Sequence, residues 1–109
     1  MNIELLRDYV VKKPFVTEGF PFGENVIVFK VNNKIFLLVP LDANPLQFNA
    51  KCDPERSLEL REEYPSAVLP GYHMNKKHWN TVIADGSLSK KQLLELVDHS
   101  YQLVAKIKK

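Results

Sequence analysis

The stretch that most restricts the fold of this chain is VIVFKVNNKIFLLV, residues 26–39. Two runs rich in β-branched and aromatic residues flank Asn32-Asn33, and asparagine tolerates the positive φ angles of a tight two-residue turn. The sequence therefore predicts an antiparallel β-hairpin at this point. Pro40 closes its second strand, because proline has no backbone N–H to donate to a neighbouring strand.

A third strand is expected in LQFNAKC, residues 46–52, where apolar and polar residues alternate. Successive side chains of a strand point to opposite faces of the sheet. One face therefore receives Leu46, Phe48, Ala50 and Cys52, and the other receives Gln47, Asn49 and Lys51. Such alternation predicts an antiparallel sheet with one buried face and one wet face.

Three helices are expected from their start and stop signals. The first ends before Pro14 and the second before Pro65, since the residue preceding a proline is disfavoured in helical geometry. Pro54 suits the first position of the second helix, and Gln92 completes a capping box for a last helix of about 18 residues. The N-cap residues of the three helices are Asn2, Asp53 and Ser89.

The remaining segments are short. Extended pieces are expected at AVL (residues 67–69) and YHM (72–74), and a longer strand at WNTVIA (79–84). The connector FVTEGFPFGEN, residues 15–25, is expected to be an ordered loop. Its aromatic residues are predicted to lie under an edge of the core, and they are Phe15, Phe20 and Phe22.

Together these elements give the order α-β-β-β-α-β-β-(β)-α, without an internal repeat or a linker. A chain of 109 residues has the size of one domain. We therefore predict a single α+β domain over residues 1–109. It is a two-layer sandwich in which helices cover one face of a twisted antiparallel sheet.

The sequence also limits the cellular setting. Cys52 is the single cysteine, so the chain has no internal disulfide and no multi-cysteine zinc site, as is typical of a reducing cytoplasm. The N-terminal MNIELLRDYVVKKP lacks the features of a signal peptide. The apolar stretch at 35–41 is far shorter than the roughly 20 residues of a membrane span. We expect a cytoplasmic monomer without membrane association.

Charge is distributed unevenly along the chain. The net charge is +2, but residues 1–75 hold eight Lys and Arg against ten Asp and Glu, whereas residues 76–109 hold seven against three. A weakly acidic body with a basic C-terminal third suits a polyanionic partner, although solubility alone explains an excess this small equally well.

The segment PGYHMNKKHWNT, residues 70–81, contains residue types that are common in catalytic and metal sites. His73 and His78 alone do not complete a zinc site, which needs three or four ligands, and His99 is expected to pair with Glu95 on the last helix. Cys52, on the apolar side of a strand, is expected to be an inert thiol. The chain contains no nucleophile elbow and no glycine-rich nucleotide motif. We therefore expect no metal, no cofactor and no enzymatic activity.

The same segment has the residue types of a nucleic-acid interface. Lys76 and Lys77 suit phosphate contacts, and Tyr72 and Trp79 can stack on exposed bases. The hydrogen-bonding side chains that can reach bases or phosphates are His73, Asn75, His78 and Asn80. A structural interpretation competes with this one: Trp79 then belongs to the core, and Asn75 caps the turn.

Nearly the whole chain resembles the MmcQ/YjbR family of small bacterial proteins. The connector and hairpin FPFGENVIVFKVNNKIFLLV are similar to the family's PFG segment, strand, tight turn and K-x-F strand. The family's central helix and signature resemble CDPERSLELREEYPSAVLPGYHMNKKHWNTV, and its closing turn and helix resemble DGSLSKKQLLELVDHSYQLV. The signature H-x-N-K-x-H-W-x-T-V runs from His73 to Val82.

This resemblance implies a CyaY-like fold, the two-layer sandwich of frataxin. It also implies DNA binding through hairpins arranged as a double wing. Iron binding of the frataxin type is not implied, because that activity depends on an acidic first helix. Here the first helix offers only Glu4 and Asp8 against Arg7, Lys12 and Lys13.

The predicted function is therefore DNA binding. The predicted contact residues are Lys51, His73, Asn75, Lys76, Lys77, His78, Asn80, Lys90 and Lys91. The alternative is a small protein- or ligand-interaction module in which residues 70–81 form a structural corner beside a polar pocket. A DNA surface is favoured if the five lysines of the predicted set share one exposed face and disfavoured if they scatter, because phosphate contacts supply most non-specific affinity.

Overall fold

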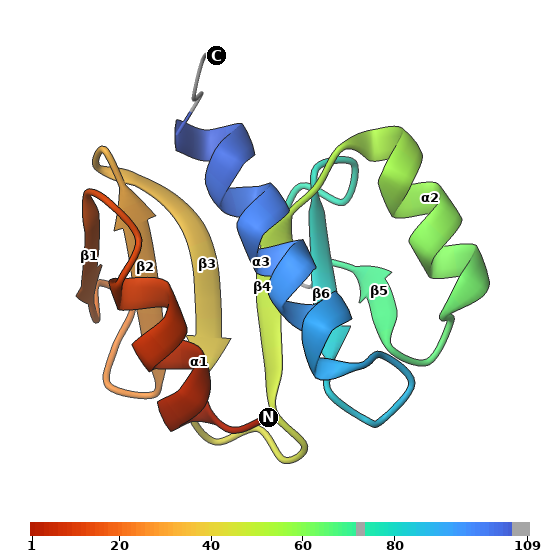
Figure 1. Ribbon diagram of the computed structural model, residues 1–109, viewed down its shortest axis with the longest axis horizontal. Coiled ribbons are helices and arrows are strands. Elements are labelled where there is room, and N and C mark those ends of the chain that lie inside the picture. Colours follow the sequence, from red (N-terminus) through yellow and green to blue (C-terminus); the bar gives the residue numbers. More distant parts are fainter. Residues whose placement is uncertain (72–73, 106–109) are drawn as a thin grey trace.

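The computed structural model describes residues 1–71 and 74–105, which form six strands and three helices (Figure 1). In chain order the elements are α1 (Ile3–Val11), β1 (Val16–Gly19), β2 (Val26–Val31), β3 (Lys34–Pro40), β4 (Gln47–Lys51), α2 (Pro54–Glu63), β5 (Val68–Pro70), β6 (Trp79–Ile83) and α3 (Lys90–Ala105). All strand pairings are antiparallel, and the strands lie in the order β1-β2-β3-β4-β6-β5. The predicted α+β class is confirmed.

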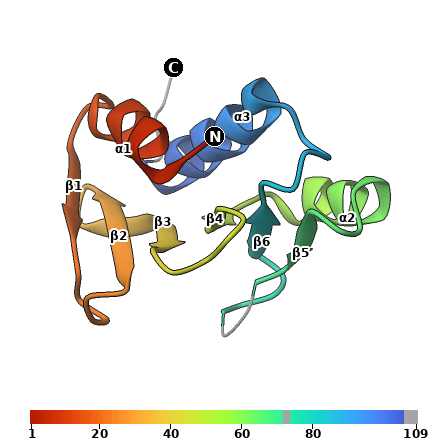
Figure 2. The same ribbon diagram turned by 90° about the horizontal axis from the view of Figure 1, so that it is seen from below.

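The helices differ in where they lie relative to the sheet. Helices α1 and α3 lie together on one face, while α2 lies beside the β5 edge (Figure 2). The core fills the space beneath α1 and α3 and includes the fully buried side chains of Phe36, Phe48 and Val97. The alternation in β4 places Phe48 and Ala50 in this core, as predicted. None of the helices in the described ranges is long and apolar enough to cross a membrane.

The hairpin between β2 and β3 turns at Asn32 and Asn33, whose φ angles are 51° and 66°. Both angles lie in the left-handed region, which asparagine adopts more readily than most residues. Val31 pairs with Lys34 across the turn, and Pro40 is the last residue of β3. The hairpin prediction is confirmed together with its turn residues.

The three predicted helix caps are also confirmed. Asn2 Oδ1 accepts a backbone N–H three residues later at 2.9 Å, and Asp53 Oδ1 accepts one two residues later at 3.0 Å. The Ser89 hydroxyl accepts the Gln92 amide at 3.1 Å, while Gln92 Oε1 accepts the Ser89 amide at 2.8 Å. These bonds satisfy N–H groups that have no partner inside the helix.

The connector at 15–25 contains a strand that was not predicted, so four strands precede α2 instead of three. Strand β1 pairs with β2, from Val16 opposite Val31 to Gly19 opposite Val28. Its sequence, VTEG, offers one large apolar residue, which is too few to reveal the period of a strand. Pairing with a neighbouring strand, and not its own composition, makes this segment extended.

The aromatic residues that flank β1 are exposed, and the prediction that they lie under the core is wrong. Phe15, Phe20 and Phe22 expose 79%, 51% and 64% of their surface. Phe15 precedes β1, and the other two follow it. Strand β1 is the outermost strand of the sheet. The residues just before and just after β1 therefore lie at the edge of the sheet, where no second layer of the described structure covers their side chains.

A serine of α3 connects two neighbouring strands. Ser100 is 0% exposed, and its Oγ donates to the carbonyl of Phe36 at 2.5 Å and accepts the amide of Lys51 at 2.9 Å. Strands β3 and β4 pair directly only at residues 37–38 and 49–50. The hydroxyl therefore satisfies backbone groups where the direct pairing ends, and it fixes α3 over the middle of the sheet.

Candidate nucleic-acid interface

The predicted interface begins at a turn just before β6. Asn75 Oδ1 accepts the Lys77 amide at 2.9 Å, and the Asn75 carbonyl accepts the amides of His78 at 3.2 Å and Trp79 at 2.9 Å. Lys76 and Lys77 are exposed. The prediction that Asn75 caps this turn is confirmed, and the turn presents two lysines to solvent.

Arg61 of α2 holds this turn in place. Its Nη2 donates to the carbonyls of Lys76 and, at 3.2 Å, Trp79, and its Nε donates to Asn80 Oδ1 at 2.8 Å. One guanidinium thus bonds three positions of the segment 76–80. The planar fork of arginine suits such multiple contacts, because its donors are fixed relative to one another.

Asn80 lies inside the protein, which corrects its predicted role. The residue is 2% exposed. Its Nδ2 donates to Ser57 Oγ at 3.1 Å, and its Oδ1 accepts from Arg61. Strand alternation directs Asn80 to the same side as the buried Val82, beneath α2. Its amide is not presented to a base or a phosphate.

The end of β4 lies against the start of β6. Lys51 pairs with Trp79, and the Cys52 amide donates to the His78 carbonyl at 2.8 Å. Lys51 and His78 are half-buried and adjoin the turn of Lys76 and Lys77. We call Lys51, Lys76, Lys77 and His78 the basic surface.

Trp79 differs from its predicted core position. The residue is half-buried and is not among the buried core residues, whereas Thr81 and Val82 expose 7% and 1%. The register places Trp79 on the sheet side opposite Val82. Its strand position is as predicted, but its ring belongs to the face that α1 and α3 do not cover.

Lys90 and Lys91 lie away from the basic surface. They begin α3, beyond the end of β6 that is opposite the turn (Figure 1). With Tyr9 and Leu94 and the acidic Glu95 and Asp98, they line a cavity of about 580 Å³ between α1 and α3. The five lysines of the predicted set therefore do not share one face, and this scatter counts against the predicted DNA surface. His73 and Tyr72 lie outside the described residues.

We call the sheet face opposite α1 and α3 the open face, because no helix of the described chain covers it (Figure 2). Strand residues that the register directs to it are Thr17, Gly19, Val26, Val28, Lys30, Ile35, Leu38, Pro40, Gln47, Asn49, Lys51, Leu69, Trp79, Thr81 and Ile83. Two of these strand residues are lysines, and none is Asp or Glu. Lys30 was not predicted as a contact. The alternation of VIVFKV nevertheless indicates that its side chain lies on the face of the strand away from Ile27 and Phe29.

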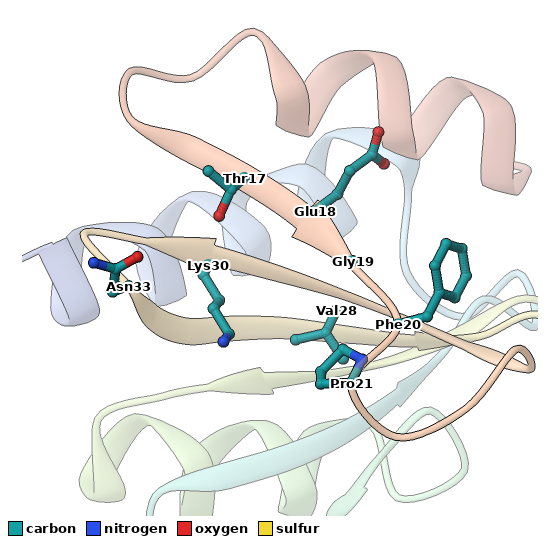
Figure 3. A pocket seen from close by; sticks show the side chains of 8 residues that line it. All are labelled: Thr17, Glu18, Gly19, Phe20, Pro21, Val28, Lys30 and Asn33. Atoms are coloured by element: carbon teal, nitrogen blue, oxygen red, sulfur yellow. The ribbon is translucent and has the colours of Figure 1, made fainter.

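A pocket of about 320 Å³ opens at the β1–β2 end of the open face (Figure 3). Its lining residues are Thr17, Glu18, Gly19, Phe20, Pro21, Val28, Lys30 and Asn33. The Lys30 side chain points away from α1, to the side opposite the Glu18 carboxylate (Figure 3). Arg7 of α1 donates from Nε to both Glu18 oxygens at 2.7 and 3.0 Å, and these bonds lower the pKa of the Glu18 carboxyl. The pocket therefore presents the Lys30 ammonium group, while the carboxylate of Glu18, its one acidic residue, is bound by Arg7 on the opposite face of the sheet.

Carboxylates are concentrated on the helices. Eight of the thirteen Asp and Glu residues lie within α1, α2 and α3. They are Glu4, Asp8, Glu55, Glu59, Glu62, Glu63, Glu95 and Asp98. The helices hold eight acidic residues against five basic ones, whereas the charged strand residues of the open face are both lysines.

Two side chains with reactive potential have structural roles. His99 Nε2 accepts the Asp53 amide at 3.1 Å, in place of the predicted pairing with Glu95, and burial lowers the pKa of this imidazole. Cys52 is 3% exposed, and burial raises the pKa of its thiol, in agreement with the predicted inert thiol. Among residues 1–71 and 74–105, no three His, Cys, Asp or Glu side chains are placed to hold a metal ion.

Comparison with known proteins gives one consistent result. A family model described as YjbR matches residues 11–103. The uncharacterized protein YbdF of Escherichia coli O157:H7 is 40% identical over 101 residues, covering 93% of this chain and 82% of that protein. The uncharacterized protein YjbR of Escherichia coli K12 is 36% identical over 102 residues, covering 94% and 86%.

Solved structures show the same fold. The crystal structure of Deinococcus radiodurans protein DR2400, described as a DUF419 domain, has a TM-score of 0.92 and 40% identity, and the match covers 96% of this chain and 79% of that one. A crystal structure of a Pseudomonas syringae protein has a TM-score of 0.80 and 30% identity, and covers 95% and 99%.

Proposed function

The chain belongs to the YjbR family, and from the distribution of charge on its structure we propose that it binds DNA, contacting phosphates through the basic surface. Lys76 and Lys77 are exposed on a turn that Asn75 and Arg61 hold in a fixed conformation. A turn that is already ordered loses little conformational entropy on binding. Less of the free energy of its lysine–phosphate contacts is therefore spent on ordering the chain. The proposed role is one of binding and requires no catalytic group, and the proposed location is the cytoplasm.

The segregation of charge is the observation that carries this proposal. The net charge of +2 by itself indicates no polyanion. The helices hold most of the carboxylates, and the basic surface adjoins an open face whose strand residues include no acid. A local concentration of one sign of charge attracts a polyanion even where the net charge is small.

Lys90 and Lys91 have no part in the proposed interface. Glu95 and Asp98 line the same cavity, and the Asp98 carboxylate is paired with Lys13. The two lysines also lie at the other end of β6, beyond the reach of a ligand seated on Lys76 and Lys77 alone. Their position makes them a control of matched charge.

The experiment compares two double variants by fluorescence anisotropy with labelled DNA, starting at about 50 mM salt, where phosphate contacts are strong. Lys76→Ala/Lys77→Ala is expected to weaken binding and to reduce the slope of log K against log salt by nearly two, at about 0.9 per lost phosphate contact. Lys90→Ala/Lys91→Ala makes the same change of net charge and is expected to leave both quantities nearly unchanged.

Two outcomes would contradict the proposal. Equal weakening by both double variants would mean that affinity follows net charge and that the turn is not the site. Absence of binding to any DNA at about 50 mM salt and tens of micromolar protein would exclude a DNA role for this domain.

The alternative, an interaction module with a structural corner at residues 70–81, is favoured by the bonds of Asn75 and Asn80. Both side chains stabilise the segment itself. Under that alternative, His73→Ala or Asn75→Ala lowers the thermal midpoint without altering any salt-dependent DNA affinity. The exposed Phe20 and Phe22 would then be candidate contacts for a protein partner.

A further inference from the structure

The open face carries features that the basic surface alone does not use. Trp79 lies at its β6 side, directly opposite Lys51 on β4, and Lys30 lies on β2. Adjacent strands are about 4.8 Å apart, so β2 and β6, which are separated by β3 and β4, lie roughly 14 Å apart. A ligand spanning Trp79 and Lys30 must therefore be extended across the strands.

The backbone of Trp79 is firmly held. Its amide donates to the Asn75 carbonyl at 2.9 Å, and its carbonyl accepts from the Gly71 amide at 2.9 Å and from Arg61 at 3.2 Å. An aromatic ring on a fixed backbone is a suitable stacking platform, because little freedom is lost when a planar group covers it.

The opposite end of the open face is chemically complementary to a nucleotide. The pocket of Figure 3 has a volume of about 320 Å³, at the lower end of the range typical of small-molecule sites. Lys30 supplies a cation, Thr17 and Asn33 supply hydrogen-bonding groups, and Phe20 and Pro21 supply apolar surface. A base with its phosphate can use a cation, hydrogen-bonding groups and apolar surface of this kind.

We infer that the preferred ligand is single-stranded nucleic acid, lying across the open face from Trp79 to the pocket at Lys30. A base stacks on Trp79, and Lys51 and Lys30 contact phosphates along the strand. In a duplex the bases are stacked on one another and paired, so it can meet Lys76 and Lys77 but offers no free base face to Trp79. This inference rests on the proposed function and adds the class of nucleic acid to it.

The test uses the full chain and two probes, an oligothymidylate of about 12 nucleotides and a duplex of equal length, a size within the range of single-strand sites. Trp79 is the only tryptophan, so its fluorescence reports directly on stacking. We expect tighter binding of the single strand, with quenching of tryptophan emission that has the same midpoint as the anisotropy change. The duplex should leave the emission nearly unchanged.

A pair of lysine variants tests the path across the sheet without altering the tryptophan. Lys30→Gln is expected to weaken single-strand binding about two- to fivefold, as for the loss of one exposed ionic contact. Lys34→Gln is the control. Lys34 pairs with the core residue Val31, so its side chain is directed to the face of the hairpin that is not the open face. It should bind like the wild type.

The outcomes separate the two proposals. Equal affinity for both probes without a change in Trp79 emission, or equal effects of Lys30→Gln and Lys34→Gln, would overturn the single-strand inference. If Lys76→Ala/Lys77→Ala still weakened binding in that case, the proposed function would stand. Absence of binding to both probes would overturn the two together.

Discussion

Arg61 Nε donates to Asn80 Oδ1 over 2.8 Å, and this bond joins α2 to the buried side of β6. Arg61→Ala removes it, together with the bonds to the carbonyls of Lys76 and Trp79. Because Asn80 is 2% exposed, its Oδ1 would lose the hydrogen bond from Arg61 at a position that water does not reach. We expect a loss of about 1–3 kcal/mol in the free energy of unfolding, measured by urea denaturation.

Arg56→Ala is the matched control, since it removes the other arginine of α2 without breaking these bonds. Its effect should be smaller than that of Arg61→Ala, because the half-buried Arg56 makes none of these bonds. If Arg61→Ala were no more destabilising than Arg56→Ala, the guanidinium would not be what holds the turn.

Gly71 packs directly against Trp79, with no room for a side chain. A Cβ built on Gly71 would lie 2.9 Å from Trp79 Cβ and 3.0 Å from its carbonyl oxygen. Gly71→Ala must therefore displace the start of β6, at a cost of about 1–3 kcal/mol, as for overpacked sites. Thermal and urea unfolding measure this loss.

Gly19→Ala serves as the comparison, since a Cβ at Gly19 would meet nothing within 4 Å. We expect it to be neutral or slightly stabilising, because alanine restricts the unfolded chain more than glycine does. Equal destabilisation by both variants would show that contact with Trp79 is not the cause.

His99 makes the stability of the fold depend on pH. Its Nε2 accepts the Asp53 amide, which requires the neutral ring, and burial lowers the pKa of His99 below its ordinary value of 6.5. The unfolded state therefore takes up a proton more readily than the folded state. The stabilisation is complete above pH 6.5 and is lost as the pH falls through the lowered pKa.

Urea unfolding at about pH 7.5 and about pH 5 measures this dependence, since the two values bracket the ordinary histidine pKa. His99→Gln keeps an acceptor but does not titrate, so the fall in stability toward pH 5 should be smaller than in the wild type. An unchanged pH profile in His99→Gln would exclude this histidine as the source.

Features set by neighbouring residues could be predicted from the sequence. The turn at Asn32-Asn33 depends on the φ angles that asparagine tolerates, and the caps at Asn2 and Ser89 depend on side chains that reach the next turn of the same helix. The turn at Asn75 belongs to this group as well. In each case the interacting groups are a few residues apart, so a short stretch of sequence includes both partners of the interaction.

Features set by distant residues could not be predicted. Arg61 reaches residues 76–80 only because α2 packs beside β5 and β6, and Ser100 meets Phe36 and Lys51 only after α3 crosses the sheet. Exposure of the phenylalanines around β1 depends on that strand being outermost. The hydrophobic pattern of a sequence shows which side chains are apolar. Whether such a side chain is buried depends on whether another helix or strand packs over it in the fold.

The uneven distribution of charge, with most carboxylates on the helices and only lysines among the charged strand residues of the open face, has a kinetic consequence. Such a molecule has an electrostatic dipole, and the field of a polyanion turns it during approach so that its lysines arrive first. Orientation of this kind does not require a large net charge, and it acts on the rate of association more than on the lifetime of the complex. Mobile salt ions screen the field, so productive encounters become rarer as ionic strength rises.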